Sequence, residues 1–274
     1  MTLPNFIFAG VPKSGSSTLF EYIRQHPDIY MSEVKEPFFF DFNYQKGLSH
    51  YETFFKNHKG EKIIGEATVW YMSWKKATQR IYETIPNTKL LFILRNPIER
   101  AFSDYCMNLR AGHYTPEQTF GYVIRNEQNI SKLNRRIVSG GFYYQHLKRF
   151  EQYFPRENML IILYDELKQD IRAVEKRIYQ FLEVDPDFQA EVQKNYMVAP
   201  YLPNHKLLTQ YSRYLPGFNQ AWSRYRHFRN LFMDYNSKNK NRMSDEDRDY
   251  LCEIYSQENQ LLGDYTGVDL KHWN

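Results

Sequence analysis

The sequence is poor in cysteine, in long apolar runs and in excess charge of either sign. Its 274 residues include two cysteines, Cys106 and Cys252, which are too few for a disulfide framework and favour a reducing compartment. No run approaches the roughly 18 apolar residues of a membrane span, and Met1–Asn5 lacks the pattern of a signal peptide. The formal net charge of +4 is too small to indicate nucleic-acid binding. These absences predict a cytoplasmic protein with no membrane span and no nucleic-acid partner.

Short apolar segments alternate with amphipathic ones along most of the chain. We expect strands at 5–11, 62–66, 89–95 and 158–164. We expect helices at 16–25, 48–57, 74–84, 97–111, 141–152, 171–182 and 244–262. This alternation predicts the α/β class, with a central parallel sheet flanked by helices on both faces. A chain of this length can bury one substantial core, so we expect a single domain over residues 1–274.

The segment 186–243 interrupts the alternation. It contains Pro200, Pro203 and Pro216, many tyrosines and the basic run Lys238–Arg242, and it shows no clear strand period. It has neither an internal repeat nor low complexity. We therefore interpret it as an irregular, aromatic-rich lid or acceptor-side insertion within the domain, and not as a linker.

Residues 6–20 have the pattern of a buried strand, a glycine-containing turn and the start of a helix. Backbone N–H groups at a helix N-terminus have no intrahelical partners and carry a partial positive charge, so such a turn binds anions. The spacing from Gly10 to Gly15 is that of the Walker A loop, but Ser16 stands at the lysine position and Lys13 lies earlier in the turn. The segment predicts a variant of the P-loop that binds phosphate but is not an ATP or GTP loop.

A second segment, 89–105, predicts a second anion site. Its apolar strand ends in Arg95, followed by Asn96 as a helix N-cap and Pro97 at the first helical position. Ser103 lies about 9 Å along the axis of this helix, at about 1.5 Å per residue. Arg95 leaves the carboxyl end of the strand, where open α/β sheets bind ligands. We therefore expect Arg95 and Ser103 to bind a second phosphate, remote from the first.

In this order, the two segments resemble the sulfotransferase superfamily, which transfers a sulfuryl group from 3′-phosphoadenosine 5′-phosphosulfate (PAPS). The first segment is similar to the family's 5′-phosphosulfate loop, and the second to its 3′-phosphate motif. The resemblance implies a P-loop-type fold and the use of PAPS as donor substrate. It also implies a set of residues that bind PAPS: Lys13, Ser14, Gly15, Ser16, Ser17, Arg95 and Ser103.

Further motifs are similar to the heparan sulfate N- and 3-O-sulfotransferases, more than to the cytosolic phenol and steroid enzymes. These motifs are His26–Asp28 and Lys35–Asp41, and the resemblance is clear over about residues 5–185. It places Glu36 at the position of the family's catalytic glutamate. Lys240 and Arg242 resemble a late PAPS-contacting loop, although Asn241 replaces its middle glycine. Vertebrate members of this branch are Golgi membrane proteins, so this chain resembles a soluble, bacterial-type member.

In-line sulfuryl transfer makes two demands on side chains. The leaving oxygen gains negative charge, and Lys13 with the loop N–H groups would stabilise it. The acceptor must lose a proton, for which Glu36 is the candidate base, with its basicity raised by aromatic neighbours. His26 is expected to pack at a helix end, and it and Glu66 are the next candidates for the base. We expect no metal, because the sulfuryl group carries less charge than a γ-phosphate. Consistently, no clear Walker B aspartate follows an apolar strand.

Three departures from the 3-O-sulfotransferases bear on the acceptor. Ser17 stands where they carry arginine, Phe38 where they carry histidine, and Ala67 where they carry lysine. These changes argue against a highly sulfated glycan. We expect a hydroxyl of a neutral or lightly charged sugar, of a lipid or of another small acceptor, and less an amine. Aromatic side chains that suit such an acceptor lie in the insertion, at Tyr201, Tyr211, Tyr214, Phe218, Trp222 and Tyr225.

Two other classes remain open at this point. A P-loop kinase for a small metabolite would share the strand, turn and helix, but it would need lysine at position 16 and ligands for Mg²⁺. A catalytically inactive nucleotide-binding protein would keep the phosphate sites without a base, and the presence of Glu36 argues against it. The oligomeric state also stays open.

Overall fold

The computed structural model describes residues 2–111, 113–114, 117–130, 136–191 and 243–274. The chain divides into two compact units. The first comprises Met1–Pro97, Phe142–Met197 and Tyr255–Asn274, and the second comprises Ile98–Gly141 and Val198–Ile254. The predicted insertion at 186–243 lies almost entirely outside the described residues, so its interpretation stays a prediction. No helix among the described residues is both long and apolar enough to span a membrane.

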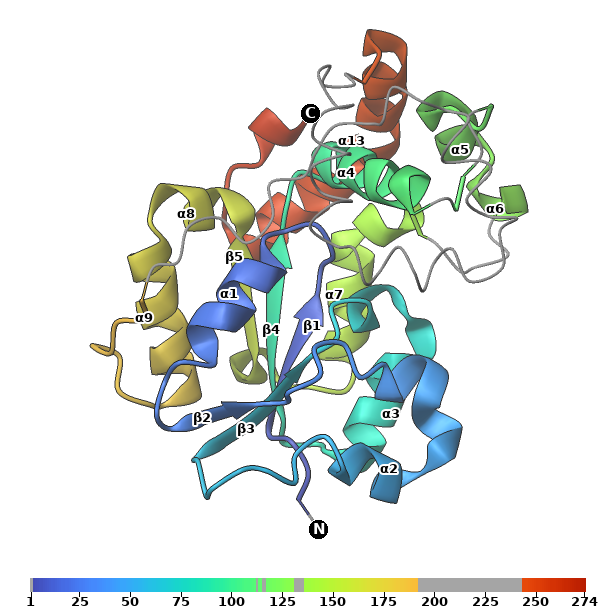
Figure 1. Ribbon diagram of the computed structural model, residues 1–274. Helices are drawn as coiled ribbons and strands as arrows, with labels where there is room; N and C mark the ends of the chain where they lie inside the picture. Colours follow the sequence, from blue (N-terminus) through green and yellow to red (C-terminus); the bar gives the residue numbers. More distant parts are fainter. Residues whose placement is uncertain (1, 112, 115–116, 131–135, 192–242) are drawn as a thin grey trace, which may run out of the picture. The chain divides into compact units, whose positions relative to one another are not determined.

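The first unit is built on a five-stranded, all-parallel sheet with the strand order β2-β3-β1-β4-β5 (Figure 1). The strands are β1 (Phe6–Gly10), β2 (Ile29–Met31), β3 (Ile63–Ala67), β4 (Lys89–Leu94) and β5 (Met159–Leu163). The predicted α/β class and the four predicted strands are confirmed. The sequence analysis missed β2, because three residues are too few to show a period.

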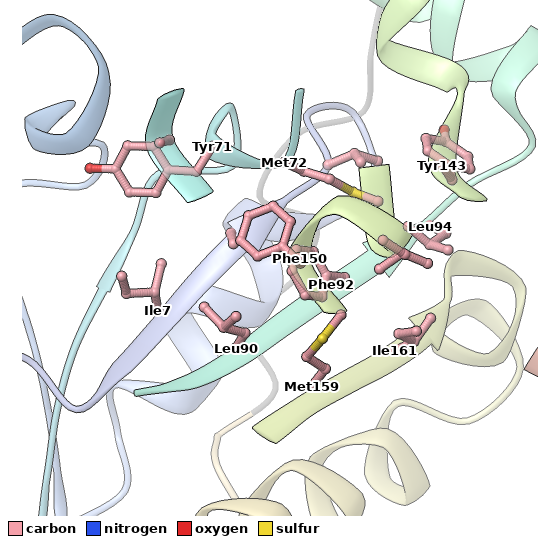
Figure 2. Close-up of a cluster of buried hydrophobic side chains, with 14 of the residues drawn as sticks. Ile7, Tyr71, Met72, Leu90, Phe92, Leu94, Tyr143, Phe150, Met159 and Ile161 are labelled. Carbon is pink, nitrogen blue, oxygen red and sulfur yellow. The ribbon is translucent and has the colours of Figure 1, made fainter. Parts of the chain in front are cut away.

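Both faces of the sheet are buried, which explains why most of the strand residues are apolar. Along β1, Ile7 and Ala9 belong to one core cluster, and Phe6 and Phe8 to the other. Figure 2 shows part of the first cluster, where Leu90, Phe92 and Leu94 of β4 lie beside Phe150. The sheet therefore has no polar face, and its edges and strand ends are where polar chemistry can occur.

Helices of the first unit cover the two faces. The first core cluster includes residues of α2 (Leu48–Glu52), α3 (Lys75–Thr84) and α7 (Tyr143–Glu151). The second includes residues of α1 (Ser16–Ile23), α8 (Tyr164–Gln169) and α9 (Ile171–Leu182). The prediction missed α8, which follows β5 without a loop, and α2 is shorter than the predicted 48–57. Short helical turns connect these elements: η1 (Phe39–Asn43), η2 (Tyr44–Lys46), η3 (Tyr71–Ser73) and η5 (Arg156–Asn158). A further turn, η6 (Lys271–Trp273), follows α13.

The second unit is helical. It contains α4 (Pro97–Arg110) from its second residue on, α5 (Phe120–Arg125), α6 (Glu127–Ile130), η4 (Ser139–Gly141) and the first part of α13 (Asp245–Thr266). Pro97 opens α4 as predicted, because proline suits a position whose N–H would have no partner. The buried pair Arg100 and Asp104 lies within α4, at 3.7 Å. Arg125 of α5 binds the carboxylate of Asp247 in α13, so distant parts of the chain are joined inside this unit.

Candidate active site

The turn between β1 and α1, residues 11–17, has the strand–turn–helix form that the sequence predicts. We call it the donor loop. The N–H of Val11 donates to the carbonyl of Ile93 in β4 at 3.0 Å, so the loop leaves the sheet beside the carboxyl end of β4. The hydroxyl of Ser14 is fully buried and donates to the carbonyl of Val11 at 2.6 Å. Ser14 therefore shapes the loop with its side chain.

Two residues of the donor loop have left-handed backbone conformations. Lys13 has φ of 71° and Gly15 has φ of 82°. A Cβ atom on Gly15 would lie 2.9 Å from Leu167 Cδ2 and 3.0 Å from Tyr164 Cε2, so a side chain there would have to displace these neighbours. The left-handed backbone and this close approach to α8 together favour glycine at position 15. The positive φ of Lys13 is a conformation that non-glycine residues adopt mainly where function demands it.

Arg95 is held by three contacts at the end of β4. Its Nη1 donates to the carbonyl of Lys13 at 3.0 Å, and its guanidinium lies 5.2 Å from the ring centroid of Tyr164. Its own carbonyl accepts from the hydroxyl of Tyr143 at 2.8 Å. The bond to Lys13 uses one of the five donors of the guanidinium, and the planar fork suits a phosphate. Arg95 therefore touches the donor loop directly.

Sequence reasoning missed Tyr143 and Tyr164. The signal for Tyr164 was present, because it follows β5 and the carboxyl ends of parallel neighbours meet at one edge of a sheet. Tyr143 gave no comparable signal, since its contact with Arg95 joins the start of α7 to the end of β4.

The start of α1 is joined to the segment that follows β2. The ammonium of Lys35 donates to the hydroxyl of Ser17 at 2.6 Å and lies 5.9 Å from the ring centroid of Phe20. Burial lowers the pKa of Lys35, against the opposing effect of the Glu36 and Glu21 carboxylates. Ser16, the first residue of α1, is buried. Lys35 thus brings a cation to Ser17 of the donor loop.

Three of the residues predicted to bind PAPS belong neither to the donor loop nor to the end of β4. Ser103 lies on α4 in the second unit, where its hydroxyl is buried and has no hydrogen-bond partner among the described residues. A buried hydroxyl without a hydrogen-bond partner is suited to form a hydrogen bond with a ligand. The pairing of Ser103 with Arg95 stays a prediction. Lys240 and Arg242 lie outside the described residues, and their role also stays a prediction.

Glu36 belongs to the segment 35–41, which we call the base segment. Its N–H donates to the carbonyl of Ala67 at the end of β3, at 2.9 Å. The φ angles are 61° at Glu36 and 52° at Phe38. Burial raises the pKa of the Glu36 carboxyl and Asp41 adds to this effect, while Lys35 opposes it. A carboxylate of raised pKa is a stronger base than an exposed one, as the predicted role requires.

Backbone strain gathers at the predicted catalytic residues. Among the described residues, the non-glycine positions with positive φ are Lys13, Glu36, Phe38 and Glu183. Two of these four are the two residues that the sequence analysis named as catalytic. Such conformations cost of the order of 1 to 3 kcal/mol each and occur preferentially at functional sites.

The aromatic run that follows Glu36 divides into two parts. Phe39 and Phe40 are fully buried in the core. Phe38 is half-buried and packs against Phe42 with 5.9 Å between ring centroids, and Phe42 packs against Trp74 at 5.1 Å. Phe42 is 61% exposed. Two members of the run, Phe39 and Phe40, are therefore core residues, whereas Phe38 lies partly at the surface.

His26 is a packing residue, as expected. The N–H of Asp28 donates to its Nδ1 at 3.1 Å, and its Nε2 lies 3.1 Å from the carbonyl of Asp185. The ring lies between Tyr179 and Phe188, at 4.8 Å from each ring centroid. A neutral imidazole with a proton on Nε2 satisfies both bonds. Buried and bonded in this way, His26 is not placed to accept a proton from a substrate.

Glu66 lies at the centre of a buried polar cluster on β3. Its Oε1 accepts from the hydroxyls of Tyr51 at 3.0 Å and Tyr71 at 2.9 Å, and its Oε2 accepts from Thr68 at 2.7 Å. Burial raises the pKa of Glu66 to about 7, although the hydroxyl donors oppose this. Its side chain is fully buried. The carboxylate is therefore shielded from any acceptor. No pattern in the sequence predicted this cluster.

Comparison with known proteins identifies the family of this chain. The sulfotransferase domain family matches residues 3–263, and the chain belongs to that family. The family resemblance drawn from the two phosphate motifs is therefore confirmed, and it speaks against the P-loop kinase alternative.

Curated relatives come from both types of heparan sulfate enzyme. Human heparan sulfate glucosamine 3-O-sulfotransferase 6 is 32% identical over 181 residues, which is 65% of this chain and 52% of the relative. Mouse bifunctional heparan sulfate N-deacetylase/N-sulfotransferase 4 is 29% identical over 202 residues, or 68% of this chain and 23% of the relative. The matches thus span about half or less of these relatives' own length.

Among solved structures, a sulfotransferase from Alicyclobacillus acidocaldarius has the same fold. It superposes with a TM-score of 0.76 at 24% identity, over 100% of this chain and 99% of that one.

Proposed function

We propose that this chain transfers a sulfuryl group from PAPS to a hydroxyl of a sugar, lipid or other small acceptor. The observation that supports this best is the hydrogen bond of 2.6 Å between Lys35 and Ser17. It ties the base segment to the donor loop, so the predicted base Glu36 adjoins a residue that touches the predicted phosphosulfate site. A nucleotide-binding protein without catalysis would not need this connection.

The donor loop has the features that an anionic donor requires. Gly15, the N-cap residue of α1, has no side chain to cap the first helical N–H groups, which leaves them to an anion. The loop N–H groups, Lys13 and Arg95 would hold the phosphates of PAPS. When bound, PAPS supplies an activated sulfuryl group on a bisphosphate leaving group.

The chain's own residues would then perform two tasks. Glu36 would accept the proton of the acceptor hydroxyl, with a basicity raised by its burial. Lys13 would stabilise the negative charge that develops on the leaving oxygen, as fixed electrostatic stabilisation. Both segments lie at the carboxyl ends of neighbouring strands, since Glu36 bonds to the end of β3 and the donor loop continues β1.

The surroundings of Glu36 favour an acceptor of low charge. Ala67, at the position of a lysine in the 3-O-sulfotransferases, is fully buried and uncharged. Phe38, at the position of their histidine, joins Phe42 and Trp74 in a partly exposed aromatic cluster. Aromatic faces bind sugars and apolar alcohols alike. A neutral sugar or an apolar alcohol therefore fits better than a sulfated glycan, and a hydroxyl better than an amine.

The direct test is transfer of radiolabel from [³⁵S]PAPS to a panel of neutral sugars, lipid alcohols, phenols and a heparan sulfate fragment. We expect label on a neutral hydroxyl acceptor, and we expect the rate to survive EDTA because no step is assigned to a metal. Preferential labelling of the sulfated fragment would contradict the acceptor class, and no label on any acceptor would contradict the reaction. The single domain, the cytoplasmic location and the bacterial type stay predictions that this assay does not address.

Binding of the product tests the two phosphate sites without turnover. Calorimetry with adenosine 3′,5′-bisphosphate should show micromolar or tighter binding in the presence of EDTA. Arg95→Ala should weaken it about tenfold or more, since losing a charge-assisted bond costs roughly 1.5 to 3 kcal/mol. The same variant should change AMP binding much less, because AMP lacks the 3′-phosphate. Equal affinity of the wild type for AMP and the bisphosphate would refute the assignment of Arg95.

A further inference from the structure

The base segment is held from behind by a buried cluster of hydroxyl groups. We propose that Glu66 is a positioning residue, which acts through Tyr71 and Thr68 on the backbone that follows Glu36. The inference rests on the proposed function in one respect, namely that Glu36 is the base. The hydrogen bonds that carry it do not depend on that assignment.

Tyr71 is the main link. Its hydroxyl donates to Glu66 Oε1 at 2.9 Å and accepts from the N–H groups of Phe39 at 2.9 Å and Phe40 at 3.2 Å. A phenolic hydroxyl has a single proton. Because this proton forms the hydrogen bond to Glu66, the lone pairs of the Tyr71 oxygen are directed to the two N–H groups of the base segment. The carboxylate thus fixes the orientation of a hydroxyl that in turn fixes the backbone.

Thr68 forms a second, weaker link to the residue just before. Its hydroxyl donates to Glu66 Oε2 at 2.7 Å and accepts from the N–H of Phe38 at 3.4 Å. The N–H groups of three consecutive residues, Phe38 to Phe40, are therefore all bonded to hydroxyls that Glu66 orients. The N–H of Glu36 itself donates to the carbonyl of Ala67, the residue next to Glu66 on β3.

The base segment needs such support because its backbone is strained. Glu36 and Phe38 have φ angles of 61° and 52°, which residues other than glycine rarely adopt. Strained conformations persist only where the surroundings over-determine them. If the bonds to Tyr71 were lost, the segment could relax and move the carboxylate of Glu36, and a displacement of about 1 Å can reduce a rate roughly a hundredfold.

Tyr51 provides a matched control within the same cluster. Its hydroxyl donates to the same oxygen of Glu66, at 3.0 Å, and its side chain is fully buried like that of Tyr71. Among the described residues its hydroxyl makes no hydrogen bond to the backbone of the base segment. Its ring stacks on Phe39 at 4.1 Å between centroids, a contact that phenylalanine would keep. Tyr51→Phe and Tyr71→Phe therefore remove the same group from the same carboxylate, and only the second removes support from the segment.

The kinetic experiment compares these two variants. We expect Tyr71→Phe to lower kcat by about tenfold to a hundredfold while KM for PAPS and affinity for the bisphosphate stay unchanged, because the loss is one of alignment. Tyr51→Phe should lower kcat by less than about threefold, although both variants lose a bond in the core. Equal losses of kcat in the two variants would overturn the proposal, since a general loss of packing would then explain both.

Hydrogen–deuterium exchange measures the same support without any substrate. In Tyr71→Phe, peptides that contain Phe38–Phe40 should exchange faster than in the wild type, and in Tyr51→Phe they should not. Unchanged exchange in Tyr71→Phe would overturn the proposal even if kcat fell. If the wild type transferred no sulfuryl group, the proposed function would fail, while the exchange experiment would still decide whether Tyr71 holds the segment.

A second pair of variants covers the case in which Tyr71→Phe does not fold. Thr68→Val keeps the shape of the side chain and removes the hydroxyl, whereas Thr68→Ser keeps the hydroxyl. We expect Thr68→Val to lower kcat several-fold at unchanged bisphosphate affinity, and Thr68→Ser to restore most of it. Glu66→Gln keeps an oxygen that accepts from Tyr71, so its loss of kcat should be smaller than that of Tyr71→Phe. A loss as large as that of Glu36→Gln would make Glu66 the base and end its positioning role.

Discussion

The donor loop and the base segment are joined by the hydrogen bond from Lys35 to Ser17, but they are held in place in different ways. The internal form of the donor loop comes from groups within it, such as the bond from Ser14 to Val11 and the left-handed Gly15, while the bonds from Val11 to Ile93 and from Arg95 to Lys13 attach it to the end of β4. The base segment is shaped by distant groups, such as Tyr71 and Arg80, which donates to the carbonyl of Phe40 at 2.8 Å. A site can therefore combine a locally encoded part with a part whose geometry depends on the whole core.

The strongest way to separate the two parts is to disable the base and leave the donor loop intact. Glu36→Gln should lower the transfer rate by roughly a hundredfold to ten-thousandfold, the range typical of a general base, at nearly unchanged affinity for the bisphosphate. Steady-state rates with acceptors of graded acidity provide the measurement. An acidic phenol should be largely rescued, because it loses its proton without help, and an aliphatic alcohol should not.

Glu33→Gln is the control for this prediction. Glu33 is an exposed carboxylate three residues before Glu36, bonded to Asn57 at 2.6 Å, and its loss should not affect the rate. If the ratio of wild-type to Glu36→Gln rates stays near one for an aliphatic alcohol, Glu36 is not the base.

The converse change disables the donor loop and leaves the base segment intact. Lys13→Ala should lower the transfer rate by about a hundredfold to a thousandfold, the effect of removing one preorganised electrostatic group. Affinity for the bisphosphate, measured by calorimetry, should fall much less, because the charge on the leaving oxygen develops mainly in the transition state. Lys46→Ala, at an exposed lysine, is the control. Parallel losses of rate and affinity would reduce Lys13 to a phosphate anchor.

The smallest expected effect concerns the stability of the cluster behind the base segment. The pKa of Glu66 is about 7 in the folded chain against 4.5 for an exposed glutamate, so folding favours the protonated carboxyl. This stabilisation is complete below the unfolded pKa and is lost as the pH rises through about 7. The stability difference between the wild type and Glu66→Gln should thus shift by about 2 kcal/mol, against the wild type, from roughly pH 5.5 to 8. Urea unfolding across this range measures it, and a constant difference would contradict the raised pKa.

The same contrast explains what the sequence could predict. The donor loop was predictable because its spacing, its glycine and its helix start lie within fifteen residues of one another, where local rules decide conformation. The strand ending in Arg95 and the helix beginning at Pro97 were predictable for the same reason. Family resemblance added Glu36, which no local rule would have selected from among the carboxylates.

The support of the base segment could not be predicted, because it depends on contacts between residues far apart in the chain. Glu66 and Tyr71 are ordinary residues in sequence, and their roles arise only when β3 and η3 pack beneath the segment. The strand β2 was missed since it is short, and Lys35 was noted as part of a motif but not as a partner of Ser17. Tertiary packing supplied all three findings.

The hydrogen bond from Arg95 to the carbonyl of Lys13 has a consequence for how the two ends of a donor nucleotide would be sensed. Under the proposed function, one guanidinium both binds the 3′-phosphate and anchors the loop that faces the sulfuryl group. Binding at one end is then linked to binding at the other, and such linkage is reciprocal. A nucleotide without the 3′-phosphate would lose a contact and would also leave Arg95 free to reorient, loosening Lys13. The 3′-phosphate takes no part in the bonds that break. Through Arg95, it would nevertheless determine whether Lys13 is held in place for the transfer.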